Sequence, residues 1–172
     1  MISQPARQVC RCLLTSVLAL VVAACSAQQP LPDSQSSGQR VISRPAPART
    51  ASVGERAAAV AVQQVGVPYR YGGHSPAGFD CSGLVHYSYS RAGKPVARTT
   101  AALWNTLTPV EARQMRTGDL LFFRIEGKMS HVGLYLGDGR FVHAPSSGRS
   151  VTIEDLDDEY YRRALIGAGR PR

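Results

Sequence analysis

The stretch Gly78-Phe79-Asp80-Cys81-Ser82-Gly83-Leu84-Val85 places one cysteine where a glycine-rich turn gives way to an apolar helix pattern. A helix N-terminus stabilises a thiolate, because its unpaired N–H groups and the positive end of its dipole favour negative charge. The stretch therefore predicts a helix that begins at Cys81 and makes this residue a candidate nucleophile. A lone cysteine among apolar residues is otherwise a small, inert core side chain. The rest of the sequence must decide between these two interpretations.

Cysteine usage bears directly on that choice. The four cysteines are Cys10, Cys12, Cys25 and Cys81, and only the last lies in the part of the chain that we expect to fold. Neither an intramolecular disulfide framework nor a CxxC metal site can form there. A single free thiol of this kind calls for a chemical reason.

Residues 1–24 have the layout of a secretory signal peptide. Arg7 and Arg11 precede an apolar run over residues 13–22, which is too short for a comfortable transmembrane helix. The sequence Leu-Val-Val-Ala-Ala-Cys at 20–25 resembles the bacterial lipoprotein signal, which implies lipidation at Cys25. An ordinary signal peptide with a coincidental cysteine is the alternative. Because Ser26, and not aspartate, follows Cys25, the resemblance implies the periplasmic face of the outer membrane rather than the inner membrane or the soluble periplasm.

Composition divides the remainder of the chain into a linker and one domain. After Cys25, the segment up to residue 51 is rich in Gln, Pro, Ser, Ala and Arg and predicts a flexible linker. Residues 52–172 then suit a single globular domain, which we expect to be a monomer. The net charge of the chain is +8. Without Arg7 and Arg11 it falls to +6, from 18 basic and 12 acidic residues. Such a surface suits an anionic polymer such as cell wall, whereas the scattered arginines argue against nucleic acid.

The expected helices precede the expected strands. A capping box at Ser52 and Glu55 begins a helix that runs to Gln64. The pattern indicates further helices over 81–91 and 99–104, another helix start at 108–111, and strands over 120–124, 131–136, 140–144 and 151–153. This order predicts an α+β fold, with N-terminal helices packed on one side of an antiparallel sheet.

Two histidines in neighbouring strands complete a candidate constellation. His131 and His143 are twelve residues apart, an even number, so we expect them on one face of the sheet if the hairpin has no bulge. A cysteine nucleophile needs a base and a third group that orients the base, and His131 and His143 fill these roles. Alternatively, His143 is a half-buried strand residue, or Cys81, His131 and His143 hold a catalytic zinc ion.

Four motifs in order resemble the NlpC-type family of bacterial cell-wall cysteine peptidases over about residues 52–170. They are Phe79-Asp80-Cys81-Ser82-Gly83-Leu84-Val85, Thr117-Gly118-Asp119-Leu120-Leu121-Phe122-Phe123, Ser130-His131-Val132-Gly133-Leu134-Tyr135-Leu136-Gly137 and Phe141-Val142-His143-Ala144. The resemblance implies a permuted papain-like domain without a cofactor, in which the helix with the nucleophile packs against a sheet with the base and orienter. One departure is Val96-Ala97-Arg98, where the family usually has a Pro-Arg pair. We expect Arg98, like Arg70, to be a solvated surface residue.

The resemblance also implies individual roles. It makes Cys81 the nucleophile, paired as a thiolate with protonated His131, and His143 the orienting residue. It assigns Tyr69 to the oxyanion, and Asp80 and Ser82 to the lining of the peptide-binding cleft.

The implied substrates are stem peptides of peptidoglycan, cut at the γ-D-glutamyl-diaminopimelate or the D-alanyl-diaminopimelate bond. Two alternatives remain open at this point. One is a peptidoglycan-binding module without turnover, and the other is a zinc-dependent amidase that uses the same residues.

Overall fold

The computed structural model describes residues 50–172. The predicted signal peptide, Cys25 and nearly all of the predicted linker lie outside the described residues. The helices are α1 (Val53–Val62), α2 (Cys81–Arg91), α3 (Thr100–Thr106) and α4 (Glu159–Ala164), with a 3-10 turn at Ala112–Gln114. The strands are β1 (His74–Ser75), β2 (Gly78–Phe79), β3 (Thr108–Val110), β4 (Leu120–Ile125), β5 (Lys128–Gly137), β6 (Arg140–His143), β7 (Thr152–Asp155) and β8 (Leu165–Arg170). Across residues 50–172, no helix combines the length and apolar character needed to cross a membrane.

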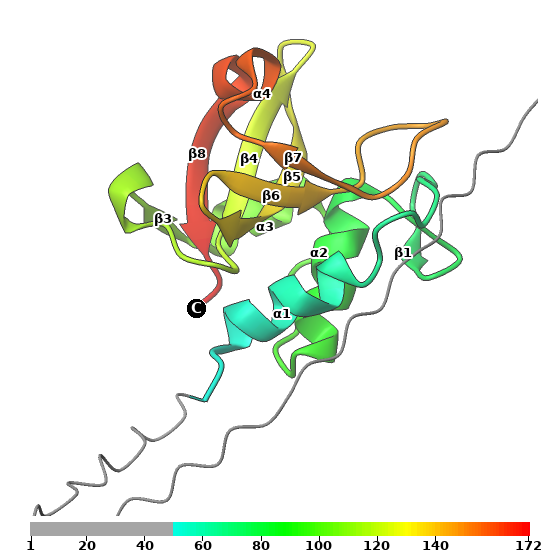
Figure 1. Cartoon of the computed structure of the whole chain (residues 1–172), viewed down its shortest axis with the longest axis horizontal. Helices are drawn as coiled ribbons and strands as arrows, with labels where there is room; N and C mark the ends of the chain where they lie inside the picture. Colours follow the sequence, from blue (N-terminus) through cyan, green and yellow to red (C-terminus); the bar gives the residue numbers. More distant parts are fainter. Residues whose placement is uncertain (1–49) are drawn as a thin grey trace, which may run out of the picture. The chain divides into compact units, whose positions relative to one another are not determined.

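The helix predictions for the N-terminal half are confirmed. The Ser52 hydroxyl accepts from the Glu55 N–H at 3.2 Å, and the Glu55 carboxylate accepts from the Ser52 N–H at 2.6 Å, so the capping box begins α1. Helix α2 begins at Cys81, as predicted, and ends before Gly93, whose φ of 88° no longer continues a helix. The two helices pack against each other on the same side of the sheet (Figure 1).

The main sheet has six antiparallel strands in the order β3-β8-β4-β5-β6-β7. The four predicted strands are β4 to β7, in sequential order. The predicted helix start at 108–111 is wrong, because Thr108–Val110 pairs with β8 as an edge strand. Pro109 is compatible with this edge, where one side of the strand needs no ladder donor. Strand β8 was not expected, because its Gly167 and Gly169 weaken the strand signal.

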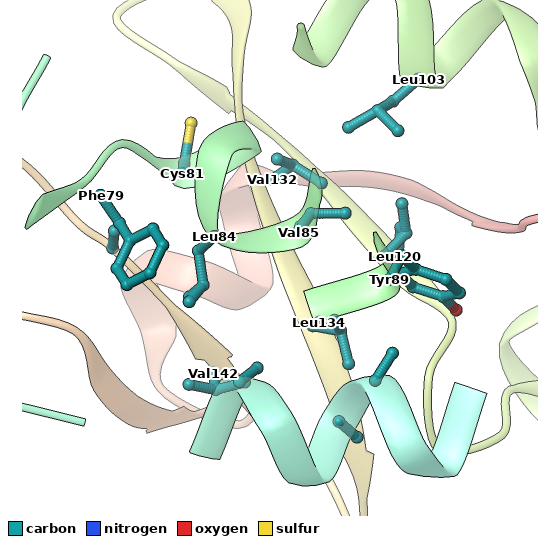
Figure 2. Packing of buried hydrophobic residues seen from close by; sticks show 14 of the residues in the cluster. Phe79, Cys81, Leu84, Val85, Tyr89, Leu103, Leu120, Val132, Leu134 and Val142 are labelled. Carbon is teal, nitrogen blue, oxygen red and sulfur yellow. The ribbon is translucent and has the colours of Figure 1, made fainter. Parts of the chain in front are cut away.

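Successive side chains of the central strands point to opposite faces of the sheet, so each face has its own hydrophobic core. Side chains of Leu120, Phe122, Val132, Leu134 and Val142 pack with α1 and α2. Figure 2 shows this cluster, with the Cys81 sulfur at its edge and directed away from the packed side chains. The opposite face carries Leu121, Phe123 and Phe141, which pack with Tyr161 and Ala164 of α4. The N-terminal helices therefore pack on one side of the sheet, as predicted, and the unpredicted helix α4 covers the opposite face.

Candidate active site

The N-terminus of α2 is held by a network centred on Asp80. Its carboxylate caps the helix by accepting from the Gly83 N–H at 2.6 Å, and its other oxygen accepts from the Gly72 N–H at 2.9 Å. Glycine is required at position 83, because a Cβ atom there would lie 1.9 Å from the Gly73 carbonyl oxygen. The turn before the helix is thus packed directly on its first turn, which fixes the backbone of Cys81.

Arg98 completes this network. Its guanidinium donates to both oxygens of Asp80 at 2.9 and 2.7 Å, to Ser82 Oγ at 3.1 Å and to the Gly73 carbonyl oxygen at 3.2 Å. The expectation that Arg98 is a solvated surface residue is therefore wrong. The signal was present in the sequence, since an arginine just before a helix can reach a buried carboxylate, but its partner Asp80 is 18 residues away.

Cys81 is buried, with 9% of its surface exposed, and is the one free cysteine among residues 50–172. Its Sγ lies 3.8 Å from Thr100 Oγ1 and 3.8 Å from the carbonyl oxygen of Ser130 in β5. Burial raises the pKa of the thiol, although the backbone N–H of Val132 and the hydroxyl of Thr100 act in the opposite direction. The resting side chain at neutral pH is therefore the neutral thiol.

Strand register brings the two histidines together. His131 Nε2 and His143 Nδ1 are 2.6 Å apart, and the two rings are nearly perpendicular. Gly137 pairs with Arg140 around the turn, but beyond Leu136 the register shifts and Tyr135 pairs with Phe141. Without this bulge, His143 would lie opposite Leu134 and on the other face from His131. The prediction of a shared face is confirmed, but its condition was wrong, because the bulge itself creates the shared face.

Both imidazoles are neutral in the folded protein at neutral pH, because burial lowers their pKa values. His131 is 7% exposed and His143 1% exposed. Burial lowers the pKa of His131 to about 4. Burial, followed by repulsion from His131 and Arg149, lowers the pKa of His143 to about 3. A neutral imidazole carries one N–H and one acceptor nitrogen, so His131 is able to accept a proton at neutral pH.

Tyr161 is a member of this site that sequence reasoning missed. Its hydroxyl lies 3.3 Å from His143 Nε2, on the side of the ring opposite His131. The Asp158 side chain caps α4 and thereby places Tyr161 on the histidine face of the sheet. No local motif marks this tyrosine, because its role depends on how the short helix α4 packs on strands earlier in the chain.

A cavity of ≈ 730 Å³ joins these groups to the surface. Cys81, His131, His143 and Tyr161 line it, together with Tyr69, whose pKa is raised by burial and by the nearby Cys81 and Asp80. Further lining residues carry charge, and they are Glu126, Arg149, Glu154 and Asp158.

Asp80 and Ser82 do not line this cavity. Both are buried, and their side chains bind Arg98 and each other beneath the first turn of α2. The expectation that they line the cleft is not met, because the cap network occupies the hydrogen-bonding atoms that a substrate would need. Their position instead supports the backbone that carries Cys81.

A cysteine at a helix N-terminus, set against an antiparallel sheet that presents a histidine pair, defines a papain-like α+β domain. The chain belongs to the NlpC/P60 family, whose family model matches residues 66–170. This assignment confirms the resemblance seen in the sequence motifs. The match begins in the turn after α1 and continues to the last residue of β8.

Relatives from several bacteria agree with the assignment. Murein DD-endopeptidase MepH of Escherichia coli is 42% identical over 115 residues, covering 63% of this chain and 42% of the relative. Bifunctional muramidase/DL-endopeptidase CwlT of Bacillus subtilis is 39% identical over 114 residues, covering 64% of this chain and 34% of the relative. The chain thus spans less than half of the length of these relatives.

Solved structures share the fold. An NlpC/P60 family protein from Bacillus cereus superposes with a TM-score of 0.65 and 32% identity, over 71% of this chain and 41% of that one. The NlpC/p60 domain of the peptidoglycan hydrolase SagA gives a TM-score of 0.60 and 34% identity, over 68% of this chain and 97% of that domain.

Proposed function

We propose that this chain is a peptidoglycan endopeptidase that hydrolyses stem-peptide amide bonds with Cys81 as nucleophile, His131 as general base and His143 as the residue that orients the base. One observation carries the proposal. The hydrogen-bonded pair of His131 and His143 lines the same cavity as a cysteine held at a helix N-terminus. A nucleophile, a base and an orienting group in one cavity are the components of acyl transfer.

The charge states favour attack by a neutral pair over a preformed thiolate and imidazolium. The pKa of Cys81 is raised and that of His131 is lowered, so the proton rests on sulfur before substrate binds. His131 Nε2 faces His143, which leaves Nδ1 as the nitrogen that takes the thiol proton while Sγ attacks the carbonyl carbon. The protonated His131 then gives this proton to the leaving amine, and water releases the acyl group from Cys81.

Cys81 and His131 must approach each other before this step. Among the described residues, the Sγ atom contacts Thr100 and the Ser130 carbonyl oxygen, and no hydrogen bond joins it to His131. We infer that the Cys81 side chain approaches the imidazole when substrate binds. Catalytic hydrogen bonds often form only when substrate is bound. Tyr69, which lines the same cavity, supplies a hydroxyl for the oxyanion.

The substrate class follows from the charges of the cavity and from the relatives. Arg149 presents a cation beside the carboxylates of Glu154 and Asp158, which suits a peptide that carries both carboxylate and ammonium groups. Stem peptides with a diamino acid have this character. Relatives are named for both DD- and DL-endopeptidase activity, so we propose a bond next to the diamino acid as the point of cleavage.

A zinc-dependent amidase is the alternative that uses the same three side chains. Against it, His131 Nε2 and His143 Nδ1 face each other at hydrogen-bond distance, so these two nitrogens are not both open to one cation. Within residues 50–172, no group of three His, Cys, Asp or Glu side chains is arranged to hold a metal. The other alternative, a binding module without turnover, keeps the cavity but leaves the histidine pair without a chemical role.

Digestion of purified peptidoglycan tests the function. Fragments released by the wild type, Cys81→Ala and the control Ser90→Ala, at the exposed end of α2, are identified by mass spectrometry. We expect the wild type and Ser90→Ala to release stem peptides cut next to the diamino acid, and Cys81→Ala to release none. A chelator should not change this cleavage. Full activity of Cys81→Ala would contradict the thiol mechanism, and loss of activity on chelation would favour zinc.

We also propose that the domain is anchored through a lipid at Cys25 to the periplasmic face of the outer membrane, where its substrate lies. The support is the sequence signal at residues 20–25. Fractionation of cells that express Cys25→Ser is the test. The variant should move to the soluble periplasm, whereas an unchanged distribution would contradict the anchor.

A further inference from the structure

The hydrogen bond between the two histidines leaves the position of one proton open. If His131 Nε2 donates to His143 Nδ1, then His131 Nδ1 is free to accept the thiol proton and the proton of His143 is on Nε2. If His143 Nδ1 donates instead, the proton of His131 is on Nδ1. In that second arrangement His131 cannot act as a base toward Cys81. The choice between the two tautomers therefore decides whether the site is active.

The hydrogen-bond partner of His143 on its other ring nitrogen determines which tautomer forms. His143 Nε2 meets the hydroxyl of Tyr161 at 3.3 Å. A hydroxyl can accept or donate, but only acceptance by Tyr161 places the His143 proton on Nε2. Burial raises the pKa of Tyr161 to about 12, so the hydroxyl keeps its own proton. Tyr161 also lines the cavity, where its O–H can donate a hydrogen bond to water while its oxygen accepts from His143.

The tyrosine is held firmly in place for this role. Only 7% of its surface is exposed, and its ring packs edge-on against Phe141, Phe123 and His143. In the alternative arrangement, the Nδ1–H of His131 would have no acceptor among the described residues and could donate only to water in the cavity that His131 lines.

We propose that Tyr161 is a positioning residue: by accepting a hydrogen bond from His143 Nε2–H, it fixes the tautomers that leave His131 Nδ1 free to take the Cys81 proton. This inference rests on the proposed function, because it concerns how the same site is held ready. It extends the hydrogen-bonded series of His131 and His143 to a residue of α4 that touches neither the nucleophile nor the base. The proposed effect of its hydroxyl runs through His143.

The tautomers are measured directly in the full chain. Long-range 1H–15N correlation spectra at neutral pH distinguish Nδ1–H from Nε2–H, with the four histidines assigned by single His→Gln variants. We expect Nε2–H on both His131 and His143 in the wild type. Tyr161→Phe should move part of the population to Nδ1–H. A wild-type proton on His143 Nδ1, or unchanged tautomers in Tyr161→Phe, would overturn the proposal.

Kinetics provide the second readout. Loss of one buried hydrogen bond corresponds to a fall of about 5- to 100-fold in kcat, with KM changed less than about twofold. Tyr89→Phe is the matched control, because Tyr89 is also buried and its hydroxyl donates one hydrogen bond of 2.6 Å, to Gly118. Its kcat should stay at the wild-type value. An equal fall in both variants would assign the Tyr161 effect to stability and overturn the proposal.

A double-mutant cycle isolates the route through His143. In a His143→Ala background, Tyr161→Phe should cause no further loss of kcat, because the residue through which it acts is gone. A full additional loss would overturn the proposal. If the wild type cuts no peptidoglycan at all, the proposed function fails, whereas the spectra still decide which tautomer Tyr161 favours.

Discussion

Replacement of Arg98 by alanine should destabilise the domain more than removal of any exposed ion pair. The guanidinium binds both oxygens of Asp80, whose side chain is only 13% exposed, while Arg98 itself is 32% exposed. Without it, the carboxylate stays buried with only the N–H groups of Gly83 and Gly72 and the Ser82 hydroxyl as donors. The Gly73 carbonyl oxygen loses a donor as well.

The size of the effect follows from this partial burial. Breaking a buried ion pair from one side costs about 3–5 kcal/mol, whereas exposed pairs contribute less than about 1 kcal/mol. Because solvent reaches a third of Arg98, we expect a loss of about 2–3 kcal/mol in the free energy of unfolding. For a domain of this size, that corresponds to a fall of roughly 6–15 °C in Tm. Arg98→Lys keeps the charge but not the bidentate contact with Asp80. Its free energy of unfolding should therefore lie between those of the wild type and Arg98→Ala.

Urea unfolding followed by circular dichroism measures the difference. The matched control is Arg163→Ala, which removes an ion pair with Glu159 whose side chains are 77% and 65% exposed. We expect this control to change the free energy of unfolding by less than about 0.5 kcal/mol. If Arg98→Ala lost no more than the control, the network would not stabilise the start of α2. The structural role assigned to Asp80 would then be wrong.

Three further predictions concern the site and its support. Alkylation of Cys81 by iodoacetamide should accelerate with pH up to and beyond pH 9, because burial raises the pKa of its thiol; a rate already at its plateau at pH 6 would show a preformed ion pair instead. Because the pKa values of His131 and His143 are lowered on folding, the unfolded chain binds protons more readily below pH 6.5. Stability should thus be full above pH 6.5 and decline toward pH 4, by on the order of 3 kcal/mol for His131 alone, and His131→Gln should flatten this decline in urea titrations. Gly83→Ala should prevent the turn at Gly73 from packing on α2 and abolish cleavage, and a stable, active variant would contradict the close approach.

Much of the fold could be predicted because its signals are local. The capping box at Ser52, the helix start at Cys81 and the alternation in β4 to β6 each depend on neighbouring residues. Strand β8 and helix α4 could not be predicted in this way. The glycines of β8 lower its intrinsic preference for a strand, yet they admit Trp104 and Leu107 close to its backbone.

The candidate site was predicted in part for the same reason. Cys81, His131 and His143 lie in recognisable motifs, and the structure places all three around one cavity. Their shared face depends on a bulge at Leu136, which strict counting of residues does not reveal. Arg98 and Tyr161 were missed because their partners are remote in sequence.

The central claim, that Cys81 forms an acyl-enzyme with the stem peptide, is tested most directly by trapping that intermediate. The full chain is mixed with purified muropeptides, quenched in acid and digested, and the masses of its peptides are measured. We predict an added acyl fragment on the peptide that contains Cys81, removable by hydroxylamine and absent from Cys81→Ala. Turnover of the muropeptides without such an adduct, and undiminished in Cys81→Ala, would contradict the account.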